Sequence, residues 1–322
     1  MTPRERALFA EMERRAARLE PGLRRAILEA FRRLASQLDT AAIERAIRTG
    51  DIDAMLASAL PDGAVNRAFY GARKLARDGA ATAANATIRN TPSLRELGIR
   101  FDMLSPQVLD AVRTIESGSL GFLQGEMRDG LRAAVTSGLE AGVGPRTIAR
   151  GLTNALGLTA HQQGIIANFR AALEAGDAAK ALGYTLRDKR FDSQLRRLAA
   201  TETPLTPEQI DRMVAGYQRK YKAYNAEVHA RTAALESQRV GAQMAWKELA
   251  AELGPDVVVI KRWNATMDAR VRPEHAAMNG AEALLDGAYR TGETYPGQNN
   301  PWNCRCVETY RVARADNFQL NP

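Results

Sequence analysis

Both cysteines of the chain lie close together near its C-terminus, and they restrict what this part of the protein can form. Cys304 and Cys306 are separated by one residue, and His275 precedes them in the same loop-rich stretch, which begins at Trp263. A disulfide between cysteines with this spacing has awkward geometry, and two cysteines cannot build a disulfide framework. We therefore expect reduced thiols with another purpose, in a reducing cytoplasm.

The chain changes character at residues 254–256, just before this stretch. Upstream, the sequence is rich in Ala, Leu and Arg and only 6% of the whole chain is aromatic, which favours helices. Downstream, residues 257–263 are β-branched and predict a strand. We expect a mainly α fold with a small C-terminal α+β domain, in which long helices precede a short antiparallel sheet that carries the histidine and the cysteines.

Three regions are predicted from these changes. Residues 1–117 are expected to form an N-terminal helical region, residues 118–254 a central helical region in which a hinge is one of two alternatives, and residues 255–322 the C-terminal α+β domain. The length of 322 residues is enough for about two domains, at about 150 residues per domain.

Helix starts and glycines mark the central part of the chain. Ser105–Pro106 is expected to start one helix, and Thr206 with Gln209 forms a capping box that starts a long helix ending near Glu252. Glycines recur between 118 and 144, and each isolated one weakens a helix by about 1 kcal/mol relative to Ala. They indicate either close helix packing or a hinge.

The chain is basic, with a formal net charge of +8. Such a charge permits attraction to nucleic acid. Arg219, Lys220 and Lys222 lie among tyrosines of the long helix, and a cluster of this type can grip a nucleic-acid backbone and stack on bases. The competing interpretation is that the tyrosines pack one helix against another. We expect no membrane association, because the sequence lacks a secretory signal and any run of about 18 apolar residues.

His275, Cys304 and Cys306 supply three candidate metal ligands, and Asp268 is a candidate fourth, a set that suits tetrahedral zinc. Residues 303–306 are expected to belong to a strand that continues through Tyr310, which places both thiols on one face. Two other interpretations stay open. One is a metal-free cysteine pair beside a structural histidine, and the other is a catalytic Cys–His pair in a thiol- or metal-dependent hydrolase.

The same stretch resembles the Mu F-like domain of tailed-phage minor head proteins, also called head morphogenesis proteins. The residues that carry the resemblance follow one another in a fixed order around a variable spacer: Trp263, Thr266, Asp268, Arg270, Val271, Arg272, Pro273, His275 and Gly280, then Pro301, Asn303, Cys304, Arg305 and Cys306. Upstream, residues 144–149 and 230–233 also fit the layout of this family, although the second segment lacks the acidic residue of the family's "ARTE"-like helix.

The resemblance implies that residues 255–322 form a Mu F-like domain. It also implies a virion structural protein and not an enzyme. Such proteins bind the portal protein, meet capsid or scaffold proteins, and assist head assembly, DNA packaging or DNA ejection. The implied location is the capsid interior near the portal vertex, after assembly in the host cytoplasm. Non-specific contact with double-stranded DNA is also implied, and the positive charge would suit it.

Overall fold

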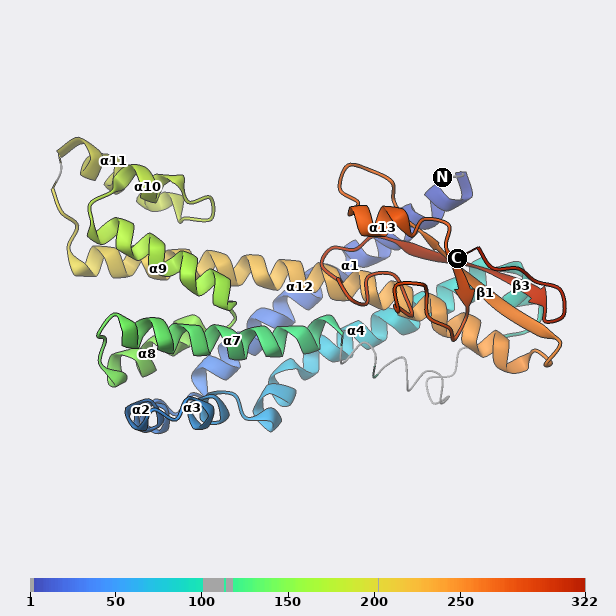
Figure 1. Ribbon diagram of the computed structural model, residues 1–322, viewed down its shortest axis with the longest axis horizontal. Coiled ribbons are helices and arrows are strands. Elements are labelled where there is room, and N and C mark those ends of the chain that lie inside the picture. The colour runs from blue at the N-terminus through green and yellow to red at the C-terminus, as the bar shows by residue number, and fades with distance from the viewer. Residues whose placement is uncertain (1–2, 101–112, 114–117, 202, 322) are drawn as a thin grey trace. The chain divides into compact units, whose positions relative to one another are not determined.

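A computed structural model describes residues 3–100, 113, 118–201 and 203–321 (Figure 1). The predicted fold class is confirmed, because the described chain is mainly helical with one small antiparallel sheet near the C-terminus. The elements are α1 (Pro3–Ser36), α2 (Thr40–Thr49), α3 (Ile52–Ala59), α4 (Asp62–Asn90), α5 (Pro92–Glu96), α7 (Ser119–Glu140), α8 (Pro145–Ala155), α9 (Ala160–Glu174), α10 (Ala178–Gly183), the 3₁₀ helix η1 (Lys189–Phe191), α11 (Asp192–Thr201), α12 (Pro207–Glu252), β1 (Val257–Asn264), α13 (Pro273–Ala277), β2 (Glu282–Leu284) and β3 (Val307–Arg314). The expected helix start at Ser105–Pro106 lies outside the described residues.

The chain forms two compact units, each assembled from separated segments. The first unit contains Met1–Arg25, Gly71–Gly121 and Val228–Pro322, and the second contains Ala26–Tyr70 and Phe122–Glu227. Helices α1, α4, α7 and α12 therefore contribute residues to both units. The three predicted regions with boundaries at 117 and 254 stay a prediction.

Helix α12 is the longest element, with 46 residues, and it starts as predicted. The Thr206 hydroxyl accepts a hydrogen bond from the Gln209 N–H, and the Gln209 side chain accepts one from the Thr206 N–H. This reciprocal pair satisfies two backbone donors at the helix start. The helix ends at Glu252, just ahead of Gly254 and Pro255.

The second unit has a core rich in aromatic rings. Tyr217 of α12 is buried, and its ring centroid lies 4.7 Å from that of Phe169 and 5.8 Å from that of Tyr184. The interpretation of Tyr217 as a packing residue is thereby confirmed. Helix α7 also packs closely, because a Cβ placed on Gly130 would lie 1.9 Å from the carbonyl oxygen of Leu158. Close packing thus accounts for Gly130, whereas nothing lies within 4 Å of a Cβ on Gly125.

The first unit contains the sheet, whose strand order is β2-β1-β3. The predicted strand at 257–263 is confirmed as β1, the central strand. It pairs antiparallel with β3 along its whole length, so that Trp263 faces Glu308, and with the short strand β2. Trp263 is fully buried in a core that also contains Tyr289 and both cysteines.

The prediction that residues 303–306 belong to this last strand is wrong. β3 begins at Val307, and Asn303 has a left-handed backbone with φ 51°. The pairing of β1 with β3 stops at Asn264 and Val307, because the next N–H, that of Ala265, donates to the side chain of Asn279. The cysteines therefore lie in an irregular segment ahead of the strand, and not on a common strand face.

Candidate metal centre

His275 lies on the short helix α13, and local sequence explains its position. Pro273 occupies the first turn, where its missing N–H is tolerated and its φ is already helical. The helix ends at Ala277. Gly280 lies three residues further on and adopts φ 92°, and its N–H donates to the Trp263 carbonyl at 2.8 Å. The His275 side chain is buried, with its ring 5.5 Å from that of Trp263 at an interplanar angle of 78°.

The two cysteines are positioned by contacts with helix α12. The N–H of Asn303 donates to the Thr232 hydroxyl at 3.2 Å, and the carbonyl of Cys304 accepts a hydrogen bond from Arg239 at 2.7 Å. The Cys304 N–H donates to the Pro301 carbonyl and closes a turn. This turn requires the left-handed conformation of Asn303, which asparagine tolerates better than most residues.

A buried polar stripe on α12 makes these contacts, and the sequence reading missed it. Thr232, Glu236 and Arg239 are all buried, and the carboxylate of Glu236 accepts a hydrogen bond from the Tyr295 hydroxyl at 3.0 Å. Their spacing of four and then three residues places them on one helix face. That spacing, in a segment otherwise rich in alanine, was the available indication that α12 holds the C-terminal loops.

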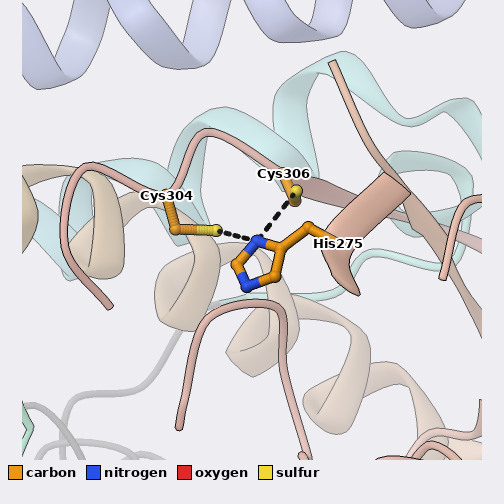
Figure 2. A group of neighbouring side chains, drawn as sticks. All are labelled: His275, Cys304 and Cys306. Atoms are coloured by element: carbon orange, nitrogen blue, oxygen red, sulfur yellow. Dashed lines mark hydrogen bonds between the residues drawn. The ribbon is translucent and has the colours of Figure 1, made fainter. Parts of the chain in front are cut away.

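The structure brings His275, Cys304 and Cys306 together (Figure 2). Their ligand atoms all lie within 4.8 Å of one another, and Nδ1 of His275 is 3.5 Å from the Cys304 sulfur and 3.7 Å from the Cys306 sulfur. Figure 2 shows that both sulfurs approach this one ring nitrogen, while the other ring nitrogen points away from them. All three side chains are at most 4% exposed.

These separations fit a zinc ion. Zn–S bonds of about 2.3 Å and Zn–N bonds of about 2.0–2.1 Å, at tetrahedral angles, put nitrogen and sulfur ligands about 3.5 Å apart. Hydrogen bonding alone explains them less well, because an imidazole Nδ1 carries one proton or one in-plane lone pair and so makes one good hydrogen bond. A metal ion shared by the three ligand atoms accounts for both sulfurs near one nitrogen.

The pKa shifts of the two thiols also favour a negatively charged centre. The pKa of Cys304 is held well below the usual thiol value by its hydrogen bond with Cys306, with help from the nearby charge of Arg239 and from His275. The pKa of Cys306 is raised by the same hydrogen bond and by burial. One negative charge is therefore already stabilised between the sulfurs, and a bound cation would favour the second.

Three buried donor atoms next to the sulfurs, on two residues, have no conventional partner among the described residues. They are the indole N–H of Trp263 and two guanidinium nitrogens of Arg239, Nε and Nη2. Both residues lower the pKa of the Cys306 thiol, so they favour its thiolate form. Buried unpaired donors are costly, and metal-bound thiolates are acceptors that would satisfy them. The residues present thus fit a metal centre.

Asp268, the candidate fourth ligand, does not join this cluster. Its carboxylate accepts a hydrogen bond from Arg305 at 2.7 Å and lies 3.7 Å from the Arg270 guanidinium. The Arg305 hydrogen bond is the main reason that the pKa of Asp268 falls to about 2. Arg305 also pairs with Glu13 of α1. Asp268 therefore links its own turn to the segment that carries the cysteines.

The remaining motif residue, Arg272, supports the same segment from the other side. Its guanidinium donates to the backbone carbonyls of Asn300 and Trp302, so it closes the loop directly ahead of Cys304. Arg270 is largely exposed, whereas the Arg305 side chain is mostly buried. Arg272 and Arg305 therefore hold the loop segments in place, whereas Arg270 is largely in solvent.

The candidate nucleic-acid residues of α12 separate in the second unit. Arg219 and Lys220 are exposed. Lys222 points inward, and its ammonium donates to the Thr153 carbonyl at 3.0 Å. Burial lowers the pKa of Lys222 to about 8. Only the first two residues are therefore available to an external phosphate.

Comparison with known families identifies the region that carries this centre. Residues 163–309 match the family described as phage Mu protein F like protein. The chain carries a phage Mu protein F-like region. The match begins in α9 and ends in β3, so it includes α12 and all three clustered ligands, and it extends much further upstream than the motif at 263–306. No curated protein and no solved structure matches the chain.

Membership of this region in the phage Mu protein F-like family implies phage head morphogenesis as the coarse function. None of the described helices is long and apolar enough to cross a bilayer.

Proposed function

We propose that this chain is a minor head protein that binds the portal protein, enters the procapsid with it, and assists head assembly, DNA packaging or DNA ejection. The match of residues 163–309 to the phage Mu protein F-like region carries this proposal. We assign the chain a structural role and no enzymatic activity. Its partners are the portal and capsid or scaffold proteins, and its location is the capsid interior near the portal vertex after assembly in the host cytoplasm.

Co-expression with the portal protein of the same phage tests the proposal. We expect the two proteins to elute together in size-exclusion chromatography, and mass spectrometry of purified virions to detect the chain in far fewer copies than the major capsid protein. If the chain is absent from both virions and procapsids, the proposal fails. A chain that is present in procapsids but does not co-elute with the portal would refute portal binding alone.

A second candidate is an accessory protein that contacts packaged DNA inside the capsid. The exposed pair Arg219 and Lys220 favours it, because both side chains are free of ion pairs to other described residues and the chain carries a net charge of +8. Lys189 and Arg190 of the same unit line a pocket with Lys220, and Arg190 is paired there with Asp188. Clustered cations of this type bind phosphates without reading sequence.

Salt dependence distinguishes this candidate. Each phosphate contact contributes about 0.9 to the slope of log affinity against log salt concentration, so R219A/K220A should flatten the slope for duplex DNA by about 1.8. The matched control is R32A/R33A, which removes the same charge from exposed residues that are already paired with Glu29. Equal flattening in both variants would show a net-charge effect and not a binding site at Arg219 and Lys220.

A further inference from the structure

The three clustered ligands line one wall of a pocket in the first unit. Its volume is about 460 Å³, and its lining includes His275, Cys304 and Cys306. An ion held by these three side chains would therefore have its remaining coordination position on the pocket side. The position of the cluster at a pocket, and not in a closed core, raises the question of what occupies that side.

The rest of the pocket lining is strongly basic. Four arginines line it, and no Asp or Glu belongs to the described lining: the arginines are Arg231, Arg270, Arg272 and Arg305. Arg272 and Arg305 are engaged by backbone carbonyls and by Asp268 and Glu13. Arg231 of α12 is half-buried and has no hydrogen bond or ion pair within the described part of the chain, and Arg270 is only loosely paired at 3.7 Å. Two guanidinium groups are thus available to a ligand.

The fourth zinc ligand is missing from the protein side chains. No further His, Cys, Asp or Glu of the described residues joins the cluster, and Asp268 is held by Arg305. A Cys₂His donor set with an open position is one that zinc uses when it keeps an exchangeable ligand. Two thiolates would neutralise the charge of the ion, so the arginines would give the pocket its positive sign.

We propose that the chain binds one Zn²⁺ ion through His275, Cys304 and Cys306, and that the fourth ligand is a phosphate-type oxyanion held by Arg231 and Arg270. Arginine suits this task, because its planar fork matches two oxygens of a phosphate group. The inference rests on the geometry of the pocket and does not depend on the proposed role in head morphogenesis.

Metal binding is tested first on the wild-type chain, so that no variant has to fold. Elemental analysis should find about one zinc per chain, and Co²⁺ added to the metal-free protein should produce the sulfur-to-cobalt absorption of a thiolate site. C304S and C306S should each lose this absorption. The metal site is refuted if the wild-type chain binds neither ion, or if both serine variants keep wild-type cobalt spectra.

The fourth position is tested by adding inorganic phosphate to the cobalt-loaded protein and following the visible bands of the metal. We expect saturable spectral shifts, and R231A should weaken phosphate binding about tenfold or more because it removes a charged hydrogen-bond donor. The matched control, R314A, removes an exposed arginine that pairs with Asp316 outside the pocket and should leave binding unchanged. An absence of any shift, or equal losses in the two variants, would overturn the anion site.

Two further measurements decide what the ligand is. A 5′-phosphorylated oligonucleotide that shifts the bands at a much lower concentration than free phosphate does would identify a nucleic-acid phosphate as the source. An equally strong response to acetate would overturn the assignment to phosphate.

D268N should leave zinc affinity within a few-fold of wild type, whereas a hundredfold loss would show that Asp268 is the fourth ligand and that the position is not open.

Discussion

Two regions of the molecule combine reactive or charged residues with aromatic ones. The fold brings these residues together in one region and separates them in the other. One is the cysteine–histidine centre of the first unit, and the other is the segment 217–224 of α12 in the second unit. In the first, residues 29 and 31 positions apart meet at hydrogen-bonding distance. In the second, neighbours in sequence separate, since Tyr217 enters the core, Lys222 turns inward and Arg219 stays in solvent.

The difference teaches that sequence proximity within a helix is weak support for a site. A helix distributes consecutive residues around its axis, so a run of cations and tyrosines does not face one ligand as a whole. The centre around His275 has the opposite character, because helix α13 and the irregular segment ahead of β3 bring residues from distant positions together there. Convergence of distant residues, with buried donors around them, is the stronger indication of binding.

The largest expected effect comes from removing the buried aromatic ring in each region. W263A and Y217A should both lower the free energy of unfolding by about 3–5 kcal/mol, because each ring is fully buried. Only W263A should also weaken zinc binding, by about 10–100-fold, since the indole lies beside Cys306 and His275. Urea denaturation and a competition assay with a chromophoric chelator measure the two effects. Equal zinc affinity in both variants would remove the distinction between the regions.

Lys222 provides the next test, in the segment 217–224. Its folded pKa of about 8 lies below the usual 10.5, so the unfolded chain binds more protons between these values and stability should rise with pH across that window. K222M removes the burial of a charge but also the hydrogen bond to Thr153. We expect it to be more stable than wild type by about 1–2 kcal/mol at pH 7, after that bond is subtracted.

The stability difference between K222M and wild type should shrink as the pH rises from 8 towards 10.5, because the folded wild-type chain no longer buries a charged lysine above pH 8. Above pH 10.5 the lysine is neutral in both states. Thermal unfolding at several pH values measures it. A difference that stays constant over this range would show that Lys222 keeps an ordinary pKa, and the inward orientation of its side chain would then have no electrostatic consequence.

The sequence predicted most of the fold and part of the site. Helix α12 and strand β1 were predictable, because a capping box and a β-branched run are local features. The strand through Cys304 was not correctly predicted, because the left-handed turn at Asn303 is set by contacts with Thr232 and Arg239 some 70 residues away. Asp268 was assigned to the metal for a similar reason, since its partner Arg305 is adjacent only in the folded chain.

Two glycines near the cysteine–histidine centre allow the cost of backbone strain to be measured separately from the cost of steric crowding. Gly297 has φ 84°, and a Cβ placed on it would lie 2.8 Å from the Cys304 sulfur, whereas Gly292 has φ 81° with nothing within 4 Å. G292A should therefore cost about 1 kcal/mol for the left-handed backbone alone. G297A should cost about 1–3 kcal/mol in total and also weaken zinc binding, because the new methyl group displaces the thiol.

The comparison between the regions predicts that replacing Gly216, next to Tyr217, with alanine destabilises the protein less than the same change at Gly297. A Cβ on Gly216 would lie 3.2 Å from side-chain atoms of Asp188 and Phe191, so modest side-chain movement accommodates it, and alanine is the better helix former by about 1 kcal/mol. We expect G216A to stay within about 1 kcal/mol of wild type in chemical denaturation. If G216A is as destabilising as G297A, the first unit is no more tightly packed around its site than the second around its aromatic core.

The smallest effect concerns Asp268, which titrates at acidic pH, whereas Lys222 titrates at basic pH. Its folded pKa of about 2 lies below the ordinary value of 3.8, so its contribution to stability is present above about pH 4 and is lost as the pH falls towards 2. The side chain is 39% exposed, so solvent screening should keep that contribution below about 1 kcal/mol. D268N should be slightly less stable than wild type at pH 6 and equally stable near pH 2, as followed by thermal unfolding. A difference that persists unchanged at pH 2 would mean that Asp268 acts through its shape and hydrogen bonds, and not through its charge, in tying Arg305 to the cysteine segment.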